Sequence, residues 1–258
     1  MLSKKRMTEY TAERFEKIRQ YHSDFSFFCR QDDLHQFRVE IKKVRMVTRI
    51  VDHCLGEKKA SEAFLPLKAL FKQAGEIRSI HIEIGILEKY ALKGSHLLKA
   101  KEKDLQRKSE IFIRKQDEYT QVIQETEAGI ISILQDFDDK DVVEYIEELI
   151  DKTSRNLSRN ENKENIHKAR SLMKVALYTT SLINRQIREM IPLDIEYMTD
   201  LQELIGHWHD ADIALDKLRP NKAIPSKIIK SMEDEANDLS RQVFLASRDF
   251  SDRIYAMA

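Results

Sequence analysis

The chain contains few residues that break helices. Its 258 residues include only 6 glycines and 4 prolines, whereas the two types together make up roughly 12% of an average protein. This scarcity argues against a glycine-rich phosphate loop, a dinucleotide-binding fold, a β-sandwich and a β-barrel. The remaining composition is rich in Lys, Glu, Leu and Ile, so we expect an all-α protein made of long helices joined by short turns.

Cysteines and long apolar segments are equally scarce. The two cysteines, Cys29 and Cys54, cannot form a disulfide framework, and so few thiols are typical of a reducing compartment. No run of about eighteen apolar residues is present, so no membrane span is predicted. The basic N-terminal residues are not followed by the apolar core of a signal peptide. These absences favour a cytoplasmic protein.

Charge is balanced over the whole chain but not along it. Lys and Arg number 44, as do Asp and Glu, so the formal net charge is zero. Residues 1–134 carry 26 basic and 20 acidic residues, whereas residues 135–258 carry 18 basic and 24 acidic ones. A neutral total argues against a general nucleic-acid-binding protein, yet it still allows a localised basic surface.

Amphipathic periodicity predicts helices along almost the entire chain. The predicted helices span about 6–29, 33–55, 58–74, 76–92, 95–134, 139–156, 163–190, 194–218 and 224–256. Their expected ends coincide with residues that terminate helices: Gly56, Gly75, Gly94, Pro192 and the Arg219-Pro220 pair. Pro66 is expected to kink the third helix or to mark its late start. A break near Gly129 is an alternative for the fifth.

Two short sequences recur at almost the same spacing. The segment from His35 to Lys42 is similar to the segment from His167 to Lys174, at an offset of 132 residues. Residues 74–79 are likewise similar to residues 205–210, at an offset of 131. Two similarities at nearly one offset indicate a duplication. We therefore expect two helical bundles, built from a first repeat of about 6–134 and a second of about 139–256.

The predicted helix that begins near Leu34 carries a continuous basic stripe. At about 100° per residue, one arc gathers a set of basic side chains: His35, Arg38, Lys42, Arg45 and Arg49. Solvated helix faces normally mix acids and bases through i,i+4 pairs, whereas these groups repel one another. A solvated face stays an alternative, but the stripe favours a groove that binds an anion.

The second repeat carries a thinner version of this stripe. Its members are Lys163, His167, Arg170, Lys174, Arg185 and Arg188, joined on the same arc by Tyr178 and Ser181. The positions that correspond to Lys43 and Arg45 are occupied here by Val175 and Leu177. Because two basic groups are missing, the second repeat is predicted to bind an anion more weakly than the first.

These paired motifs resemble those of the CHAD domain (conserved histidine α-helical domain) family. The first family signature, His-x-x-Arg-x-x-x-basic-basic-x-Arg, is matched by His35, Arg38, Lys42, Lys43 and Arg45. The second is matched in part by His167, Arg170, Lys174 and Tyr178. The Leu-Gly turns of the family resemble residues 74–79 and 204–210, although Ser79 replaces the usual Asp and His209 the usual Asn or Arg. The resemblance extends over nearly the whole chain.

The resemblance implies a single domain over residues 1–258. Its two four-helix bundles would be related by pseudo-twofold symmetry, with a basic channel between or along them. Members of the family bind inorganic polyphosphate there, and some localise to polyphosphate granules. Many are fused to a triphosphate tunnel enzyme domain, but no Glu-x-Glu-x-Lys signature lies near this N-terminus. A stand-alone CHAD protein is therefore expected.

The sequence thus predicts a non-enzymatic protein that binds inorganic polyphosphate or a similar dense polyanion. Neither a cofactor nor a metal is expected, and nucleic acid is not an expected partner. Arg forks and Lys point charges suit a flexible polyanion that has no bases to read. The predicted ligands are His35, Arg38, Lys42, Lys43, Arg45, Arg49 and Arg78 in the first repeat, and His167, Arg170, Lys174, Tyr178 and Arg185 in the second.

Two other functions stay open. The sequence His207-Trp-His209-Asp210-Ala-Asp212 could belong to a metal-dependent phosphohydrolase. However, His207 and His209 would point about 200° apart on one helix and could not share a metal by themselves. A structural role for Asp210, orienting a basic side chain, is the favoured interpretation. The remaining alternative is a helical scaffold or RNA-binding protein that uses the same basic surface.

Overall fold

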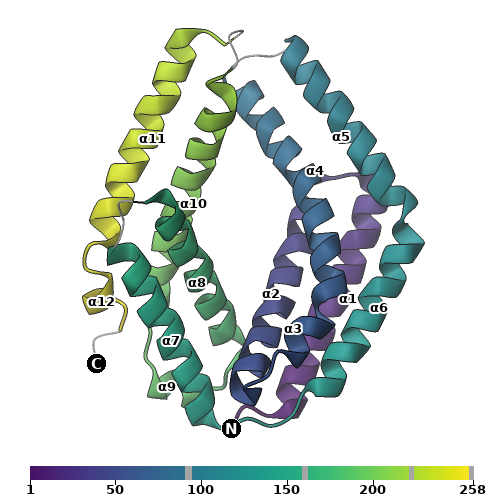
Figure 1. The fold of residues 1–258 in the computed structure, drawn as a ribbon, viewed down its shortest axis with the longest axis vertical. Coiled ribbons are helices and arrows are strands. Elements are labelled where there is room, and N and C mark those ends of the chain that lie inside the picture. Colours follow the sequence, from purple (N-terminus) through teal and green to yellow (C-terminus); the bar gives the residue numbers. More distant parts are fainter. Residues whose placement is uncertain (91–94, 159–161, 221–223, 256–258) are drawn as a thin grey trace. The chain divides into compact units, whose positions relative to one another are not determined.

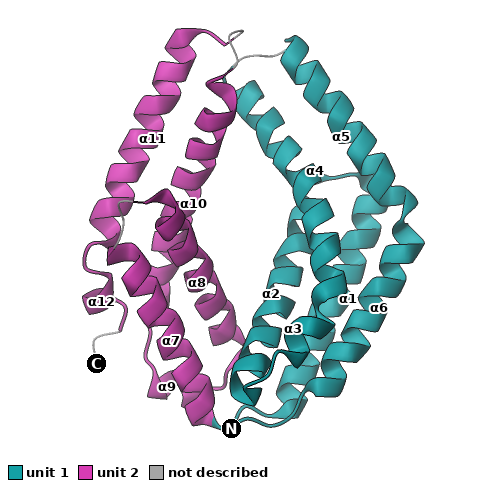
Figure 2. Ribbon diagram, in the orientation of Figure 1, with its two compact units in different colours: residues 1–138 teal, residues 139–258 magenta. Residues whose placement is uncertain are grey.

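The protein is all-α, as the scarcity of glycine and proline predicts (Figure 1). The computed structural model describes residues 1–90, 95–158, 162–220 and 224–255. The chain divides into two compact units, Met1–Asp138 and Asp139–Ala258 (Figure 2). Within the described ranges, no helix is both long and apolar enough to cross a membrane.

Unit 1 is a bundle of four helical rods, one of which is interrupted. Its helices are α1 (Lys4–Phe28), α2 (Gln31–Leu55), α3 (Lys59–Ala63), α4 (Leu65–Lys89), α5 (His96–Arg114) and α6 (Gln116–Ile133). Helix α2 packs against α1 and α4, and α6 packs against α1, the short α3 and α4. Only Lys115 separates α5 from α6, so together they form the fourth rod. The break predicted near Gly129 was wrong: the interruption falls at Lys115, and Gly129 lies inside α6.

An aromatic cluster forms the centre of unit 1. The ring of His22 on α1 lies 5.8 Å from those of Phe37 on α2 and Phe112 on α5, and the Phe112 ring lies 5.0 Å from that of Tyr119 on α6. Burial lowers the pKa of His22 to about 4, so this imidazole is neutral at pH 7. The cluster connects four helices through side chains that are almost fully removed from water.

Unit 2 also contains four long helices and two short ones among its described residues. They are α7 (Asp139–Ser158), α8 (Lys163–Leu182), α9 (Arg185–Met190), α10 (Ile195–Leu218), α11 (Ser226–Ser247) and α12 (Phe250–Arg253). Helix α8 packs against α7 and α10, and α10 packs against α11. The continuous helix predicted over 163–190 was wrong. Ile183 is extended, and the Asn184 side chain begins α9 by accepting a hydrogen bond from the backbone N–H of Ile187 at 2.9 Å.

Most of the predicted helix ends are confirmed, with one exception. Gly56 ends α2 in a left-handed conformation, with φ of 67°. Pro66 lies in the first turn of α4, which confirms the alternative of a late start. The end predicted at Gly75 was wrong, because α4 continues through this residue to Lys89. Gly94 lies outside the described residues.

Candidate anion-binding site

The side chain of Arg38, on α2, lies against the backbone of α4 at Gly75. Its Nη1 donates to the carbonyl oxygen of Phe71 at 2.5 Å, and its Cζ lies 4.0 Å from the centre of the Phe71 ring. A Cβ built on Gly75 would lie 3.1 Å from this Cζ and closer still to Nη1. The close approach therefore requires a glycine. This contact explains why α4 contains Gly75 in its interior.

Unit 2 contains the same arrangement. The Nε of Arg170, on α8, donates to the carbonyl oxygen of Gln202 on α10 at 3.0 Å. A Cβ on Gly206 would lie 3.0 Å from the Cζ of Arg170. In both units, the glycine follows the accepting carbonyl by four residues. The two predicted repeats thus share a specific contact, and the duplication itself stays a prediction.

A cationic groove of about 660 Å³ lies between α2 and α4. It is lined by Arg38, Arg45, Leu65, Lys68, Ala69, Phe71, Lys72, Gly75, Glu76 and Ser79. Within the described part of the chain, none of its four cations has a carboxylate oxygen within 4.0 Å. The carboxylate in the lining, Glu76, pairs with Lys108 at 2.8 Å, and this hydrogen bond lowers the pKa of Glu76. The groove therefore carries a net positive charge.

Like charges crowd around this groove. Burial lowers the pKa of Arg38 to about 10, and the charge of Arg78 on α4 acts in the same sense. Arg45 is exposed, but partial desolvation of its guanidinium lowers its pKa, and the charge of Arg49 acts in the same sense. The Arg38 guanidinium stays charged at neutral pH. An anion between these groups would relieve their mutual repulsion.

The structure places the other predicted ligands of the first repeat differently. The Nζ of Lys42 lies 5.9 Å from the centre of the Phe71 ring, which Arg38 also contacts. Lys43 instead pairs with Glu40 at 2.7 Å, and this buried carboxylate also pairs with Arg14 of α1 at 3.2 Å. Lys43 thus belongs to an internal ion pair and does not line the groove. His35 and Arg49 are half-buried on α2.

In unit 2, two imidazoles connect α8 with α10. The ring centres of His167 and His209 are 4.3 Å apart, and the planes are tilted by 32°. Burial lowers the pKa of His209, and the charge of His167 adds to this effect. Lys163, at the start of α8, pairs with Asp212 of α10 at 2.5 Å. The stripe on α8 therefore faces an imidazole and a carboxylate on α10.

Asp210 partly compensates the cations of unit 2. The pKa of Arg170 is lowered by burial, and the negative charge of Asp210 opposes that shift. The pKa of Lys174 is lowered by burial and by Arg170, again against Asp210. Tyr178 is half-buried on α8, and its electrostatic effect on Arg170 places it near that guanidinium. The basic residues of unit 2 thus have Asp210 as an acidic neighbour, whereas the acidic residue of the groove in unit 1, Glu76, is paired with Lys108.

The placement of Arg185 on the α8 stripe was wrong. Helix α8 ends at Leu182, so Arg185 lies at the beginning of α9, and the angular positions of α8 do not extend to it. Its Nε bonds to Glu189 at 2.6 Å, and the side chain is 92% exposed. Among the described residues, no three His, Cys, Asp or Glu side chains cluster as metal ligands.

Two cations of the groove, Lys68 and Lys72, were missed by the sequence analysis. Both are exposed on α4. Their i,i+4 spacing, followed by Gly75 three residues later, places them on one helix face. That spacing was the available signal. However, this spacing indicates a binding surface only when the Arg38 guanidinium is known to pack against Gly75.

Comparisons with known proteins identify the family and support the fold. The CHAD domain family model matches residues 9–219, a range that contains both Arg–Gly contacts. The crystal structure of the CHAD domain from the plant Ricinus communis is similar, with a TM-score of 0.65 and 14% sequence identity, over 96% of this chain and 89% of that chain. No curated protein matches the sequence. Because the family model covers most of its length, the chain belongs to the CHAD domain family.

Proposed function

We propose that the chain binds inorganic polyphosphate, or a polyanion of similar charge density, and that it is not an enzyme. The observation that carries this proposal is the groove between α2 and α4. Its four cations have no carboxylate within 4.0 Å in the described part of the chain, and its acidic residue is already paired. Cations gathered in this way favour a multivalent anion.

The chemistry of the groove suits phosphoryl groups. The hydrogen bond to Phe71 fixes Arg38 while using only one of the five N–H donors of a guanidinium. Arg45 can bind two phosphate oxygens at once. Lys68 and Lys72 add point charges from the opposite helix. Cations on two helices can follow a chain of phosphates without reading any base.

Unit 2 would contribute more weakly. Arg170 and Lys174 lie near Asp210, and Lys163 is engaged by Asp212. An anion that binds there would have to compete with these carboxylates for the cations. Most of the binding free energy should therefore come from unit 1.

The central test removes two exposed cations of the groove. In Arg45→Ala/Lys72→Ala the Arg38 contact is intact, and we expect the affinity for long-chain polyphosphate to fall about ten-fold or more. Because each phosphate contact contributes about 0.7 to the salt slope of a single-stranded polyanion, the slope of log Kd against log salt should decrease by about 1.4. Isothermal titration over a series of salt concentrations measures both quantities.

The matched control is Lys227→Ala/Arg248→Ala, which removes two exposed cations of unit 2 that lie on α11 and at its end. It should bind within about two-fold of the wild type, because the net charge changes equally without touching the groove. Unchanged binding by the groove variant would contradict the proposal. Stronger binding of RNA than of polyphosphate at matched charge would favour the RNA-binding alternative.

The non-enzymatic part of the proposal has a separate test. Purified protein with added divalent metals should release no phosphate from polyphosphate above the buffer blank. Turnover together with stoichiometric bound metal would establish the phosphohydrolase instead. In a cell, polyphosphate binding would bring the protein to cytoplasmic polyphosphate granules, and the groove variant of a fluorescent fusion should lose this localisation.

A further inference from the structure

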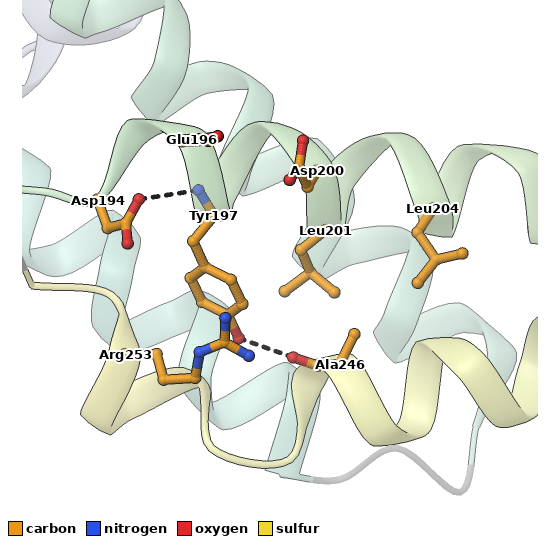
Figure 3. A pocket seen from close by; sticks show the side chains of 8 residues that line it. All are labelled: Asp194, Glu196, Tyr197, Asp200, Leu201, Leu204, Ala246 and Arg253. Atoms are coloured by element: carbon orange, nitrogen blue, oxygen red, sulfur yellow. Dashed lines mark hydrogen bonds between the residues drawn. The ribbon is translucent and has the colours of Figure 1, made fainter.

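A second pocket, of about 490 Å³, lies in unit 2 where α10 meets the end of α11 and α12 (Figure 3). It is lined by Asp194, Glu196, Tyr197, Asp200, Leu201, Leu204, Ala246 and Arg253. None of these residues belongs to the candidate anion-binding site. Three of them are carboxylates and one is a cation, so the charge of the lining is opposite to that of the groove in unit 1.

The floor of this pocket is held by specific contacts. The hydroxyl of Tyr197 donates to the carbonyl oxygen of Ala246 at 2.8 Å, which fastens α10 to the last turn of α11. The Cζ of Arg253 lies 4.1 Å from the centre of the Tyr197 ring. The backbone N–H of Asp194 donates to the carbonyl oxygen of Ile254 at 2.7 Å. The pocket is therefore preformed by the fold, and a ligand would not have to order it.

The carboxylates at the rim keep their charge unopposed. Asp194 caps α10 by accepting from the backbone N–H of Tyr197 at 2.8 Å. In the described part of the chain, neither Glu196 nor Asp200 has a basic nitrogen within 4.0 Å, and Arg253 has no carboxylate at that distance. Arg253 rests on the Tyr197 ring instead. The pocket already holds one guanidinium on an aromatic face and leaves carboxylates for further cations.

Apolar surface accompanies these acids. In Figure 3 the side chains of Tyr197, Leu201 and Leu204 extend from α10 toward α11, whereas the Asp200 carboxylate extends from the other side of the helix. Of the apolar residues in the lining, Tyr197 and Leu201 are buried, whereas Leu204 and Ala246 are half-buried and supply the accessible apolar surface. An apolar floor with an acidic rim is complementary to a helix that is apolar on one face and basic on the other.

We propose that this pocket is a docking site for a basic amphipathic segment of a partner protein. An apolar side chain of the segment would lie over Leu204 and Ala246. Its Lys or Arg residues would approach Glu196 and Asp200. Charge complementarity selects this occupant, because carboxylates at the rim repel nucleic acid, polyphosphate and anionic membrane surfaces alike. The proposal does not depend on polyphosphate binding by unit 1.

The test uses the full chain and a fluorescently labelled synthetic peptide of Lys and Leu that forms an amphipathic helix of about 15 residues. In fluorescence anisotropy this peptide should bind about ten-fold more tightly than a scrambled peptide of the same composition, because only the helix separates apolar from basic groups. A Glu–Leu peptide of the same pattern should not bind. Equal binding of the scrambled peptide, or binding of the acidic one, would overturn the proposal.

Two surface variants assign the binding to this pocket. Leu204→Ser and Asp200→Asn should each weaken binding of the Lys–Leu peptide by about five-fold or more. Their matched controls are Ile111→Ser, an exposed apolar residue of α5, and Asp238→Asn, an exposed acid of α11 outside the pocket. Unchanged affinity in both pocket variants rejects the site. Self-association of the wild type that Leu204→Ser abolishes would identify a second copy of the chain as the occupant, and would equally reject a partner protein.

Discussion

The guanidinium of Arg38 occupies the space that a side chain at Gly75 would fill. A half-buried cation thereby binds the backbone of a neighbouring helix, at the carbonyl oxygen of Phe71. The same residue contributes to the packing of α2 on α4 and to the lining of the groove. Replacing Arg38 would disturb both at once. Substitutions around it separate the two contributions.

Gly75→Ala should displace the Arg38 guanidinium. The added methyl group would overlap Nη1 and press on Cζ. Overpacking of this kind costs about 1–3 kcal/mol, and the better helix propensity of alanine returns up to about 1 kcal/mol. We expect a net loss of about 1–2 kcal/mol in the free energy of unfolding, measured in urea, together with weaker polyphosphate binding.

Gly85→Ala is the matched control for this change. It lies in the same helix, and a Cβ there would meet nothing within 4 Å. We expect a gain of about 0.5–1 kcal/mol and unchanged polyphosphate affinity. If Gly75→Ala stabilised the protein as much as Gly85→Ala does, the Arg38 guanidinium would not restrict the size of the side chain at position 75.

Lys43→Ala and Arg45→Ala should affect different properties, the first stability and the second polyphosphate affinity. Lys43 neutralises the buried Glu40, so its loss should lower the free energy of unfolding by about 1–2 kcal/mol while polyphosphate affinity changes by less than about two-fold. Arg45 lines the groove, so its loss should weaken binding without lowering stability. Titration and urea unfolding of both variants distinguish the two roles. Equal losses of affinity would restore Lys43 as a ligand.

Asp210→Asn should strengthen polyphosphate binding. The substitution removes a negative charge that acts on both Arg170 and Lys174, so a phosphate group near them would no longer be repelled. We expect an increase in affinity of about two- to five-fold in isothermal titration. Asp216→Asn, an exposed acid of the same helix, is the control for net charge. An equal gain in the control would show that only the total charge matters.

His22 should make the protein sensitive to acid. The unfolded chain protonates this imidazole below about pH 6.5, whereas the folded chain does so only near pH 4. Unfolding therefore takes up a proton between these values, and stability falls by about 3 kcal/mol as the pH is lowered through this window. His22→Leu should remove that part of the pH dependence, measured by urea unfolding. His207→Gln, at an exposed position, should leave the profile unchanged.

Patterns within one helix were sufficient to predict much of this architecture. At about 100° per residue, the second predicted helix gathers five apolar residues on one arc, which predicts a buried face: Phe37, Ile41, Val44, Val51 and Leu55. The first four are removed from water, whereas Leu55, at the end of α2, is half-buried. Periodicity on a single helix depends only on which side meets the core. The basic stripe of α2 was identifiable for the same reason.

Contacts between helices explain what these patterns missed. Gly56 and Gly75 were both expected to end helices. Gly56 has open space where a Cβ would lie and a left-handed φ, whereas the same space at Gly75 is filled by a guanidinium 37 residues earlier in the chain. The residues next to each glycine in the sequence do not reveal this difference. Lys68 and Lys72 were missed because a helical wheel for α2 has no information about α4.

The cations between α2 and α4 also affect the stability of the fold and therefore the amount of folded protein. Without a bound anion these cations lower the stability of the fold, because like charges repel one another. The charge of Arg78 lowers the pKa of Arg38, and the charge of Arg49 lowers that of Arg45. A ligand that binds only the folded state shifts the folding equilibrium toward it. Proteases remove the unfolded fraction, so under the proposed function the lifetime of the protein would lengthen as polyphosphate accumulates. Its abundance would then follow the phosphate reserve of the cell.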